Sequence, residues 1–181
     1  MRSLIDALLN YSMVSASKAE LAPTDLNAVL EEIKTNMSET IAENDAIINS
    51  SKLPTLSAIP MQLHQVFSNL ISNAIKFRKT DVPPIINISS QRVTGEDEKG
   101  NKLFINRTYW KISVHDNGIG FEQVYEHKIF ELFQRLHVKN GYPGTGIGLS
   151  ICQKIAQNHN GFMTAHGEPE KGATFNLFLP I

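Results

Sequence analysis

The sequence predicts an α+β fold, because stretches with helical periodicity are separated by stretches that alternate like strands. Residues 61–77 form the clearest helix, with an apolar stripe at helical spacing and polar side chains on the opposite face. Alternation of Trp110, Ile112 and Val114 indicates a strand, and the end of the chain indicates a closing hairpin of strands at 161–166 and 173–179. The apolar stripe consists of Leu63, Val66, Phe67, Leu70, Ile71, Ala74 and Ile75.

The beginning of the chain predicts two further helices. Residues 1–12 carry a seam of side chains that is typical of a helix that needs a partner helix. Residues 15–23 are expected to form a linker and a first edge strand, after which Thr24 or Asp25 can cap the second helix. The seam consists of Leu4, Ile5, Leu8, Leu9 and Ser12, and the second helix turns inward Leu26, Val29, Leu30, Ile33, Met37 and Ile41.

The middle of the chain is expected to contain mostly strands. Short strands are expected around Ile47 and Leu56, and a longer one at residues 85–93. Residues 95–102 are rich in charge and contain glycine, so they predict a solvated hairpin loop before a strand at residues 103–116.

The composition bears on the class of protein. Its 17 basic and 18 acidic residues give no signature of binding to nucleic acid or to an anionic membrane. No apolar run approaches the roughly 20 residues that cross a bilayer, and the first residues do not begin a signal peptide. The single cysteine, Cys152, falls on the apolar face of a helix, so we expect a core thiol and a cytoplasmic location.

The polar face of residues 61–77 predicts a binding surface. Asn69, Asn73 and Lys76 fall together there, and two amides with an ammonium are suited to hold a metal-bound polyphosphate. Mg²⁺ prefers oxygen ligands in an octahedron, and an Asn carbonyl can supply one while phosphates and waters supply the rest. Taken alone, the pattern also fits an ordinary amphipathic helix with a solvated face.

Two glycine clusters favour the nucleotide interpretation. Asp116 stands where a strand ends and a turn with Gly118 and Gly120 begins, so its carboxylate could accept a hydrogen bond from an exocyclic amine such as that of adenine. Residues 141–149 are rich in glycine and lead into a helix, where backbone amides and the helix N-terminus can approach phosphate oxygens. A plain loop would explain this cluster equally well, and it lacks the Gly-Lys-Ser/Thr ending of a P-loop.

Together, four motifs resemble the ATP-binding catalytic domain of sensor histidine kinases. The motifs are Asn-x-x-x-Asn-Ala-x-Lys-Phe from Asn69, Asp-x-Gly-x-Gly from Asp116, Ile-Phe-Glu-x-Phe from Ile129 and Gly-Thr-Gly-Ile-Gly-Leu from Gly144. They correspond to the N box, first glycine box, F box and second glycine box of that family, in the family's order. The resemblance covers residues 19–181.

The resemblance implies the Bergerat ATP-binding fold, a two-layer α/β sandwich with helices on one face of a mixed, mostly antiparallel sheet. Residues 19–181 would be the ATP-binding catalytic domain, and residues 1–18 would be the end of a dimerization and phosphoacceptor hairpin helix. The implied ligands are ATP and Mg²⁺.

The resemblance also implies roles for individual residues. Asn73 would be the Mg²⁺ ligand, Asn69 would contact the triphosphate and Lys76 would neutralise phosphate charge. Asp116 would select adenine, and Phe77 would flank the nucleotide or belong to the core. The remaining nucleotide-binding residues would be Gly118, Gly120, Gly144, Thr145, Gly146, Gly148 and Leu149.

Residues 122–143 would form a lid over the nucleotide, with Phe130 and Phe133 as hydrophobic anchors. Arg135 stands like the family arginine that reaches the γ-phosphate, so the catalytic residues implied are Asn69, Lys76 and Arg135. A solvated surface cation would explain Arg135 equally well.

The implied reaction is transfer of the γ-phosphoryl group from Mg-ATP to a histidine imidazole. None of the six histidines carries the family's His-Asp/Glu pairing on an upstream helix, so we expect the acceptor outside this chain. The implied partners are the chain's own dimerization and phosphoacceptor domain, a response regulator receiver domain and, in the full-length protein, a second copy. Neither nucleic acid nor direct membrane contact is expected.

Other classes share this fold. ATPases of the gyrase, mismatch-repair and chaperone type place a Glu four residues before the metal-binding Asn, but this chain has Asn69 there, an amide without useful basicity. Hydrolysis is therefore disfavoured. Anti-sigma-factor serine kinases are a second alternative, although they lack the N-terminal hairpin helix. A degenerate binding module is disfavoured by the intact motifs.

Overall fold

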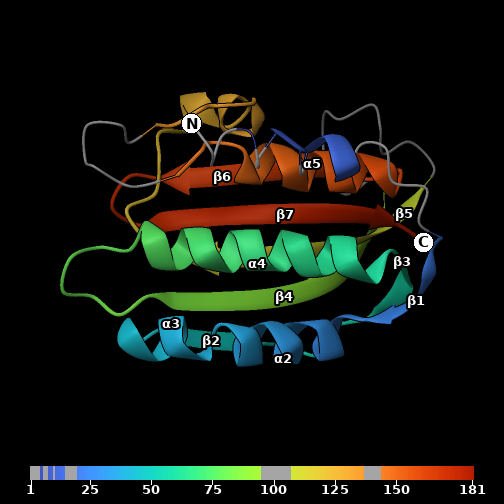
Figure 1. The fold of residues 1–181 in the computed structure, drawn as a ribbon, viewed down its shortest axis with the longest axis horizontal. Helices are drawn as coiled ribbons and strands as arrows, with labels where there is room; N and C mark the ends of the chain where they lie inside the picture. The colour runs from blue at the N-terminus through green and yellow to red at the C-terminus, as the bar shows by residue number, and fades with distance from the viewer. Residues whose placement is uncertain (1–4, 6–7, 10, 15–19, 95–106, 137–143) are drawn as a thin grey trace.

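A computed structural model of the chain describes residues 5, 8–9, 11–14, 20–94, 107–136 and 144–181. Helices cover one face of a five-stranded sheet in this part of the chain (Figure 1). The strand order is β2-β4-β5-β7-β6, in which β2 pairs with β4 in parallel and the other neighbours are antiparallel. The predicted fold class, with helices on one face of a mixed, mostly antiparallel sheet, is confirmed.

The strands of this sheet agree with the predicted ones where the structure describes them. They are β2 (Ile47–Ser50), β4 (Ile85–Thr94), β5 (Thr108–Asp116), β6 (Phe162–Glu168) and β7 (Gly172–Pro180). The expected loop at residues 95–102, and the start of the strand expected from residue 103, lie outside the described residues.

Two short strands form a separate sheet at the start of the domain. β1 (Ala22–Asp25) pairs with β3 (Thr55–Ala58) in antiparallel fashion. Asp25 then caps α2 (Leu26–Asn36), because its side chain accepts a hydrogen bond from the backbone N–H of Asn27 at 2.9 Å. Thr24, the other predicted cap, lies within β1 with its side chain buried.

The single helix expected after residue 25 is divided into two. α2 ends before Met37, and α3 (Ser38–Glu43) follows it. Asn36 and Ser38 flank the break, and both residue types favour helix ends because their short polar side chains compete for backbone hydrogen bonds. The inward side chains Met37 and Ile41 still pack against the core, so the break changes the path of the chain more than its buried face.

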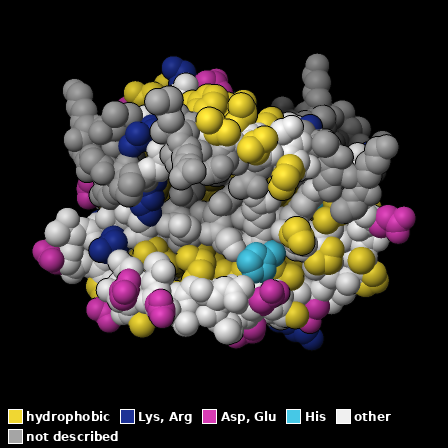
Figure 2. Space-filling model, viewed as in Figure 1, with side chains coloured by type: hydrophobic (Ala, Val, Ile, Leu, Met, Phe, Trp, Pro, Cys, Tyr) yellow, Lys and Arg dark blue, Asp and Glu magenta, His cyan; other side chains and the backbone are white. Residues whose placement is uncertain are grey.

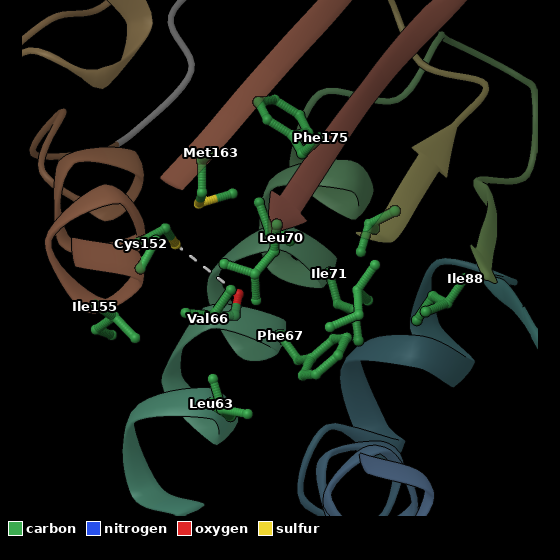
Figure 3. Packing of buried hydrophobic residues seen from close by; sticks show 14 of the residues in the cluster. Leu63, Val66, Phe67, Leu70, Ile71, Ile88, Cys152, Ile155, Met163 and Phe175 are labelled. Atoms are coloured by element: carbon green, nitrogen blue, oxygen red, sulfur yellow. Dashed lines mark hydrogen bonds between the residues drawn. The ribbon is translucent and has the colours of Figure 1, made fainter. Parts of the chain in front are cut away.

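The helix predicted at residues 61–77 is α4 (Pro60–Lys76), and it lies at the centre of the helical layer (Figure 1). Proline at the first helical position suits an N-terminus, where no N–H partner is required. Its whole predicted apolar stripe is buried, and side chains such as Phe67 and Leu70 pack between α2, α5 (Gly148–Asn158) and the sheet (Figure 3).

Hydrogen bonds at both ends of α5 help to join it to α4. Cys152 is fully buried, as expected for a core thiol, and its Sγ donates to the carbonyl oxygen of Val66 at 3.9 Å (Figure 3). Burial raises the pKa of this thiol to about 12. At the other end, the Nε2 atom of the buried His159 accepts a hydrogen bond from the N–H of Ile59 at 2.9 Å, just before α4 begins. The two helices are therefore held together along their length.

Part of the N-terminal segment is described. Val14 lies in a helical turn and packs into the main core, and its carbonyl oxygen accepts a hydrogen bond from the side chain of Asn158 at 2.9 Å. Assignment of residues 1–18 to a dimerization helix stays a prediction. Among the described helices, none is both long enough and apolar enough to cross a membrane.

Candidate functional site

A cavity of about 350 Å³ opens where α4 ends, β5 ends and α5 begins. Residues from all four sequence motifs line it, although up to 76 positions separate them in the chain. The predicted site residues that line the cavity are Asn73, Lys76, Phe77, Asp116, Gly120, Arg135, Gly144, Thr145, Gly146, Gly148 and Leu149. The fold thus brings most of the predicted nucleotide site together.

Asp116 forms one end of the cavity. Its side chain is buried, with 7% exposure, and its Oδ1 accepts hydrogen bonds from the N–H groups of Gly118 at 2.8 Å and Ala173 at 3.3 Å. Burial raises the pKa of this carboxyl, while the two backbone N–H groups and His115 oppose the rise. Among the described residues no donor reaches its Oδ2. This atom therefore remains an acceptor for a ligand.

The walls beside Asp116 are apolar. Phe121 and Phe175 line the cavity with their ring centroids 6.4 Å apart, and the apolar side chains of Ile129 and Leu136 line it as well. A flat, largely apolar ligand that presents one hydrogen-bond donor to Asp116 fits such a slot. Adenine has this combination of properties.

Cations gather at the other end of the cavity. Lys76 and Arg135 both line it, and burial together with the positive charge of Arg135 lowers the pKa of the Lys76 ammonium. The Lys76 Nζ lies 4.4 Å from the ring centroid of Phe77. Figure 2 shows several Lys and Arg side chains, with Asp and Glu side chains among them, around the end of the molecule at which α4 ends. A polyanionic ligand would relieve the repulsion between these two cations.

Gly144 allows the second glycine cluster to approach α4 closely. A Cβ atom at this position would lie 2.6 Å from the Nζ of Lys76, with no other described atom nearer. The absence of a side chain therefore lets the backbone of residues 144–146 and the ammonium share the same side of the cavity.

Asn73 is the candidate metal ligand. It is half-buried, lines the cavity, and its side-chain amide makes no hydrogen bond to any residue that the structure describes. Within that same set, no group of three or more His, Cys, Asp or Glu side chains could hold a metal ion. A single amide oxygen fits Mg²⁺ that takes its remaining ligands from phosphates and water, and does not fit an all-protein metal cage.

Two predicted residues do not line the cavity. The side chain of Asn69 points to α5, where its Nδ2 donates to the carbonyl oxygen of Gly148 at 3.2 Å and to the Sγ of Cys152 at 3.7 Å. Gly118 is buried behind Asp116 and donates its N–H to that carboxylate. Direct contact of either residue with a nucleotide stays a prediction.

The lid prediction is partly corrected. Phe130 in η3 (Lys128–Phe130) is buried, as expected of an anchor, but the Phe133 side chain is 51% exposed, so its assignment as an anchor is wrong. The backbone explains the difference, because Phe133 has a positive φ of 65°, and the chain turns there. Residues 137–143 of the expected lid lie outside the described part.

Several cavity residues were not predicted. Ser72 lies one helical turn before Lys76, and Phe121 directly follows the first glycine box, so their proximity to the motifs could have indicated them. Ala173 and Phe175 come from β7, and only the pairing of β7 with β5 brings them to Asp116. The lining residues that were not predicted individually are Ser72, Phe121, Ala173 and Phe175, together with Ile129, Gln134 and Leu136, which fall within the predicted lid at residues 122–143.

The chain is similar to a known protein family and to individual proteins. Residues 58–181 match the family described as histidine kinase-, DNA gyrase B- and HSP90-like ATPase. The chain is 40% identical, over its whole length, to cyanobacterial phytochrome A from Nostoc sp., of which it spans only 22%.

Two solved structures have the same fold. Full-length ShkA in complex with AMPPNP superposes with a TM-score of 0.74 at 26% identity, over 99% of this chain and 36% of that one. Histidine kinase ThkA in complex with the response regulator protein TrrA superposes with a TM-score of 0.70 at 22% identity, over 99% of this chain and 46% of that one.

Proposed function

Because this chain belongs to the family of histidine kinase-, DNA gyrase B- and HSP90-like ATPases, we propose that it is the ATP-binding catalytic domain of a sensor histidine kinase. The single observation that carries the proposal is the cavity itself. It presents a buried carboxylate acceptor at one end and an amide with two cations at the other, which matches the two chemically different ends of ATP.

In this proposal the residues divide the work of binding. The free oxygen of Asp116 accepts a hydrogen bond from the exocyclic amine of adenine, and it repels the carbonyl that guanine has at the same position. Phe121 and Phe175 cover the faces of the base. Lys76 and Arg135 bind the phosphates, and Asn73 contributes one oxygen ligand to Mg²⁺, which would spread the charge of the phosphates when bound.

The proposed reaction is phosphoryl transfer. The bond between the γ-phosphorus and the bridging oxygen of ATP breaks, a bond forms between that phosphorus and a ring nitrogen of an acceptor histidine, and ADP leaves. Such a loose transition state needs alignment and charge stabilisation more than covalent assistance. Lys76 and Arg135 are suited to this task, because they lie at the cationic end of the cavity.

Hydrolysis of ATP is the alternative activity within the family. It requires a general base that polarises water, and Asp116 is the only carboxylate among the described residues that line the cavity. At the position where the ATPases carry Glu, the Asn69 amide donates to Gly148 and Cys152. An amide nitrogen that donates in this way cannot act as a base.

The proposed partners follow from the domain assignment. The acceptor histidine would lie on the dimerization and phosphoacceptor domain of the full-length protein, which would be a homodimer located in the cytoplasm. The phosphoryl group would then pass to a response regulator receiver domain, a partner for which the ThkA–TrrA complex gives a precedent.

Calorimetric titration tests the proposed ligand. We expect a non-hydrolysable ATP analogue to bind this chain, more tightly with Mg²⁺ than without it, and the corresponding GTP analogue to bind at least about tenfold more weakly. Binding of both analogues with equal affinity would contradict the role of Asp116. Absence of binding of the ATP analogue both with and without Mg²⁺ would contradict the proposed function.

A further inference from the structure

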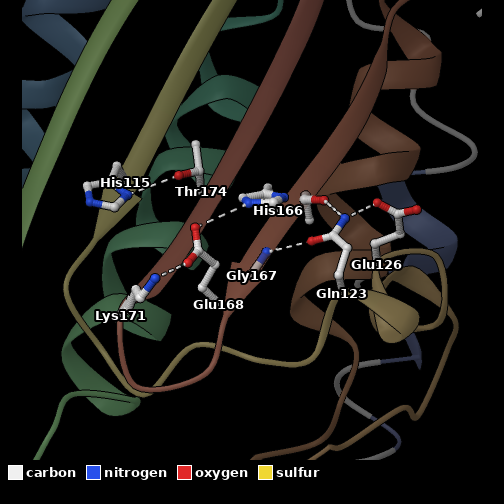
Figure 4. A network of polar contacts seen from close by, with 9 residues as sticks. His115, Gln123, Glu126, His166, Gly167, Glu168, Lys171 and Thr174 are labelled. Carbon is white, nitrogen blue, oxygen red and sulfur yellow. Dashed lines mark hydrogen bonds and ion pairs between the residues drawn. The ribbon is translucent and has the colours of Figure 1, made fainter. Parts of the chain in front are cut away.

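A glutamine side chain bonds to the β6 edge of the five-stranded sheet. β6 is the last strand in the order β2-β4-β5-β7-β6, so its outward N–H and C=O groups have no strand neighbour within the described residues. Gln123, in η2 (Gln123–Tyr125), reaches this edge: its Oε1 accepts from the N–H of Gly167 at 3.0 Å, and its Nε2 donates to the carbonyl oxygen of Ala165 at 3.5 Å (Figure 4).

This pairing imitates a sixth strand. A side-chain amide has the same donor and acceptor as a peptide group, so one Gln can satisfy both backbone groups that an adjacent strand would bind. The Nε2 of Gln123 also donates to the Oε2 of Glu126, three residues later in the same segment (Figure 4). Gln123 therefore fastens the segment that follows β5 to the β6 edge of the sheet.

A second contact holds the same segment at Gly167. A Cβ atom on Gly167 would lie 2.6 Å from the Cγ of Phe121, so the ring of Phe121 occupies the space that any other residue at 167 would fill. Gly167 thus packs against the ring of Phe121 and donates its N–H to the side-chain oxygen Oε1 of Gln123. Phe121 also faces Phe175 and lines the cavity beside Asp116.

We propose that Gln123 is a positioning residue for the base end of the nucleotide cavity: its amide clamp on β6 fixes Phe121 against Gly167 and thereby holds the wall of the slot for adenine. This inference rests on the proposed nucleotide-binding function. Gln123 itself does not line the cavity, so it acts on the ligand through Phe121.

Loss of the Gln123 clamp is expected to disturb contacts with the base and not contacts with the phosphates. Phe121 is two residues from the clamp, whereas Arg135 is twelve residues away and is separated from it by Ile129 and Phe130, which are buried in the core. Loss of the clamp should consequently weaken the binding of every adenine nucleotide by the same factor, whatever its number of phosphates.

Gln123→Ala in this chain tests the proposal by calorimetry with ADP and with AMPPNP, both in Mg²⁺. We expect the Kd of both ligands to rise by the same factor of about five, as loss of one to two ordinary hydrogen bonds would allow. Gly167→Ala should raise the Kd similarly by displacing the Phe121 ring. The Kd of the double variant should rise by less than the product of the two single increases. Gln157→Ala, on the exposed face of α5, is the matched control and should bind like the wild type.

Amide hydrogen exchange without nucleotide supplies a second readout. We expect the Gly167 amide to exchange at least about tenfold faster in Gln123→Ala than in the wild type, while amides of β5 keep their protection. Unchanged exchange at Gly167, unchanged affinity, or a loss confined to AMPPNP would overturn the inference while leaving the proposed function intact. Failure of the wild-type chain to bind either nucleotide would overturn both.

Discussion

The two ends of the candidate nucleotide cavity are built in different ways. At the base end, Asp116 is buried and two backbone N–H groups fix one of its oxygens, while Phe121 and Phe175 form apolar walls. At the phosphate end, Lys76 is only half-buried and Arg135 is exposed. The base end is thus held by the packed core, and the phosphate end by side chains that water reaches.

This difference indicates how the work of the site is divided. A pre-organised acceptor in an apolar slot contributes to affinity and to selection of the base, because its position costs little to maintain when the ligand arrives. Cations that water reaches and a lone amide contribute chiefly when a polyanion excludes water and fixes them. Substitutions at the base end should therefore change Kd, and substitutions at the phosphate end should change the rate of transfer.

The largest effect is expected from Asn73→Ala. Loss of the proposed metal ligand should lower phosphoryl transfer by at least about 100-fold, because the charge of the phosphates would then be poorly stabilised. Transfer to a separately supplied histidine-bearing hairpin domain is the measurement, and thermal unfolding is the control for the fold. A variant that transfers at the wild-type rate would remove Asn73 from the metal site.

Asp116→Asn tests the base end. The amide can still accept from Gly118 and Ala173, but it presents a weaker acceptor, or a donor, to adenine, so we expect the Kd of an ATP analogue to rise about 10- to 100-fold. Discrimination against the GTP analogue should disappear at the same time. If the variant lost affinity for both nucleotides equally and still preferred ATP, Asp116 would have a structural role only.

Arg135→Ala separates the two ends. We expect transfer to fall about tenfold, a modest loss because solvent screens an exposed cation, while affinity for ADP stays unchanged. Titration with ADP and single-turnover transfer in the same preparation give both quantities. A loss of ADP affinity without a loss of transfer would reverse the assignment of Arg135.

The smallest expected effect is a dependence of affinity on pH. Burial raises the pKa of Asp116 above the ordinary value of 3.8, so this carboxyl takes up a proton at a higher pH in the folded chain than in the unfolded chain. Its contribution to stability is therefore complete below the unfolded pKa and is lost as pH rises through the folded pKa.

The affinity for adenine depends on pH in the opposite direction to this contribution to stability. With Oδ1 already bound to two N–H groups, the proton would go to Oδ2, and the acceptor for adenine would be lost. We expect the Kd of AMPPNP to rise several-fold as pH falls from neutral through the raised pKa, and Asp116→Asn to show no such rise over that range. Identical profiles for the two proteins would assign the dependence to another group.

Local periodicity and motif order were sufficient to predict much of the molecule. The apolar stripe of α4 was predicted residue by residue, because burial of one helical face leaves a regular spacing in the sequence. The convergence of Asn73, Asp116 and Gly144 on one cavity followed from the family resemblance and is what the fold produces.

The remaining features depend on tertiary structure. Ala173 and Phe175 reach the cavity only through the register of β7 on β5. Gln123 bonds to Ala165 and Gly167, which lie about 40 residues later in the chain. The exposure of Phe133 depends on a positive φ that no hydrophobic pattern records. Such contacts arise from strand pairing and local backbone turns, and these leave no periodic signal.

Transfer of phosphate in trans tests the central claim most directly. The wild-type chain would be incubated with labelled Mg-ATP, alone and together with a separate hairpin domain that bears an acceptor histidine. The account predicts acid-labile label on the hairpin, at a low rate because the domains are not tethered, and neither label on the isolated chain nor steady release of phosphate. Acid-labile label on the isolated chain, or steady phosphate release that persists in Asn69→Ala, would contradict it.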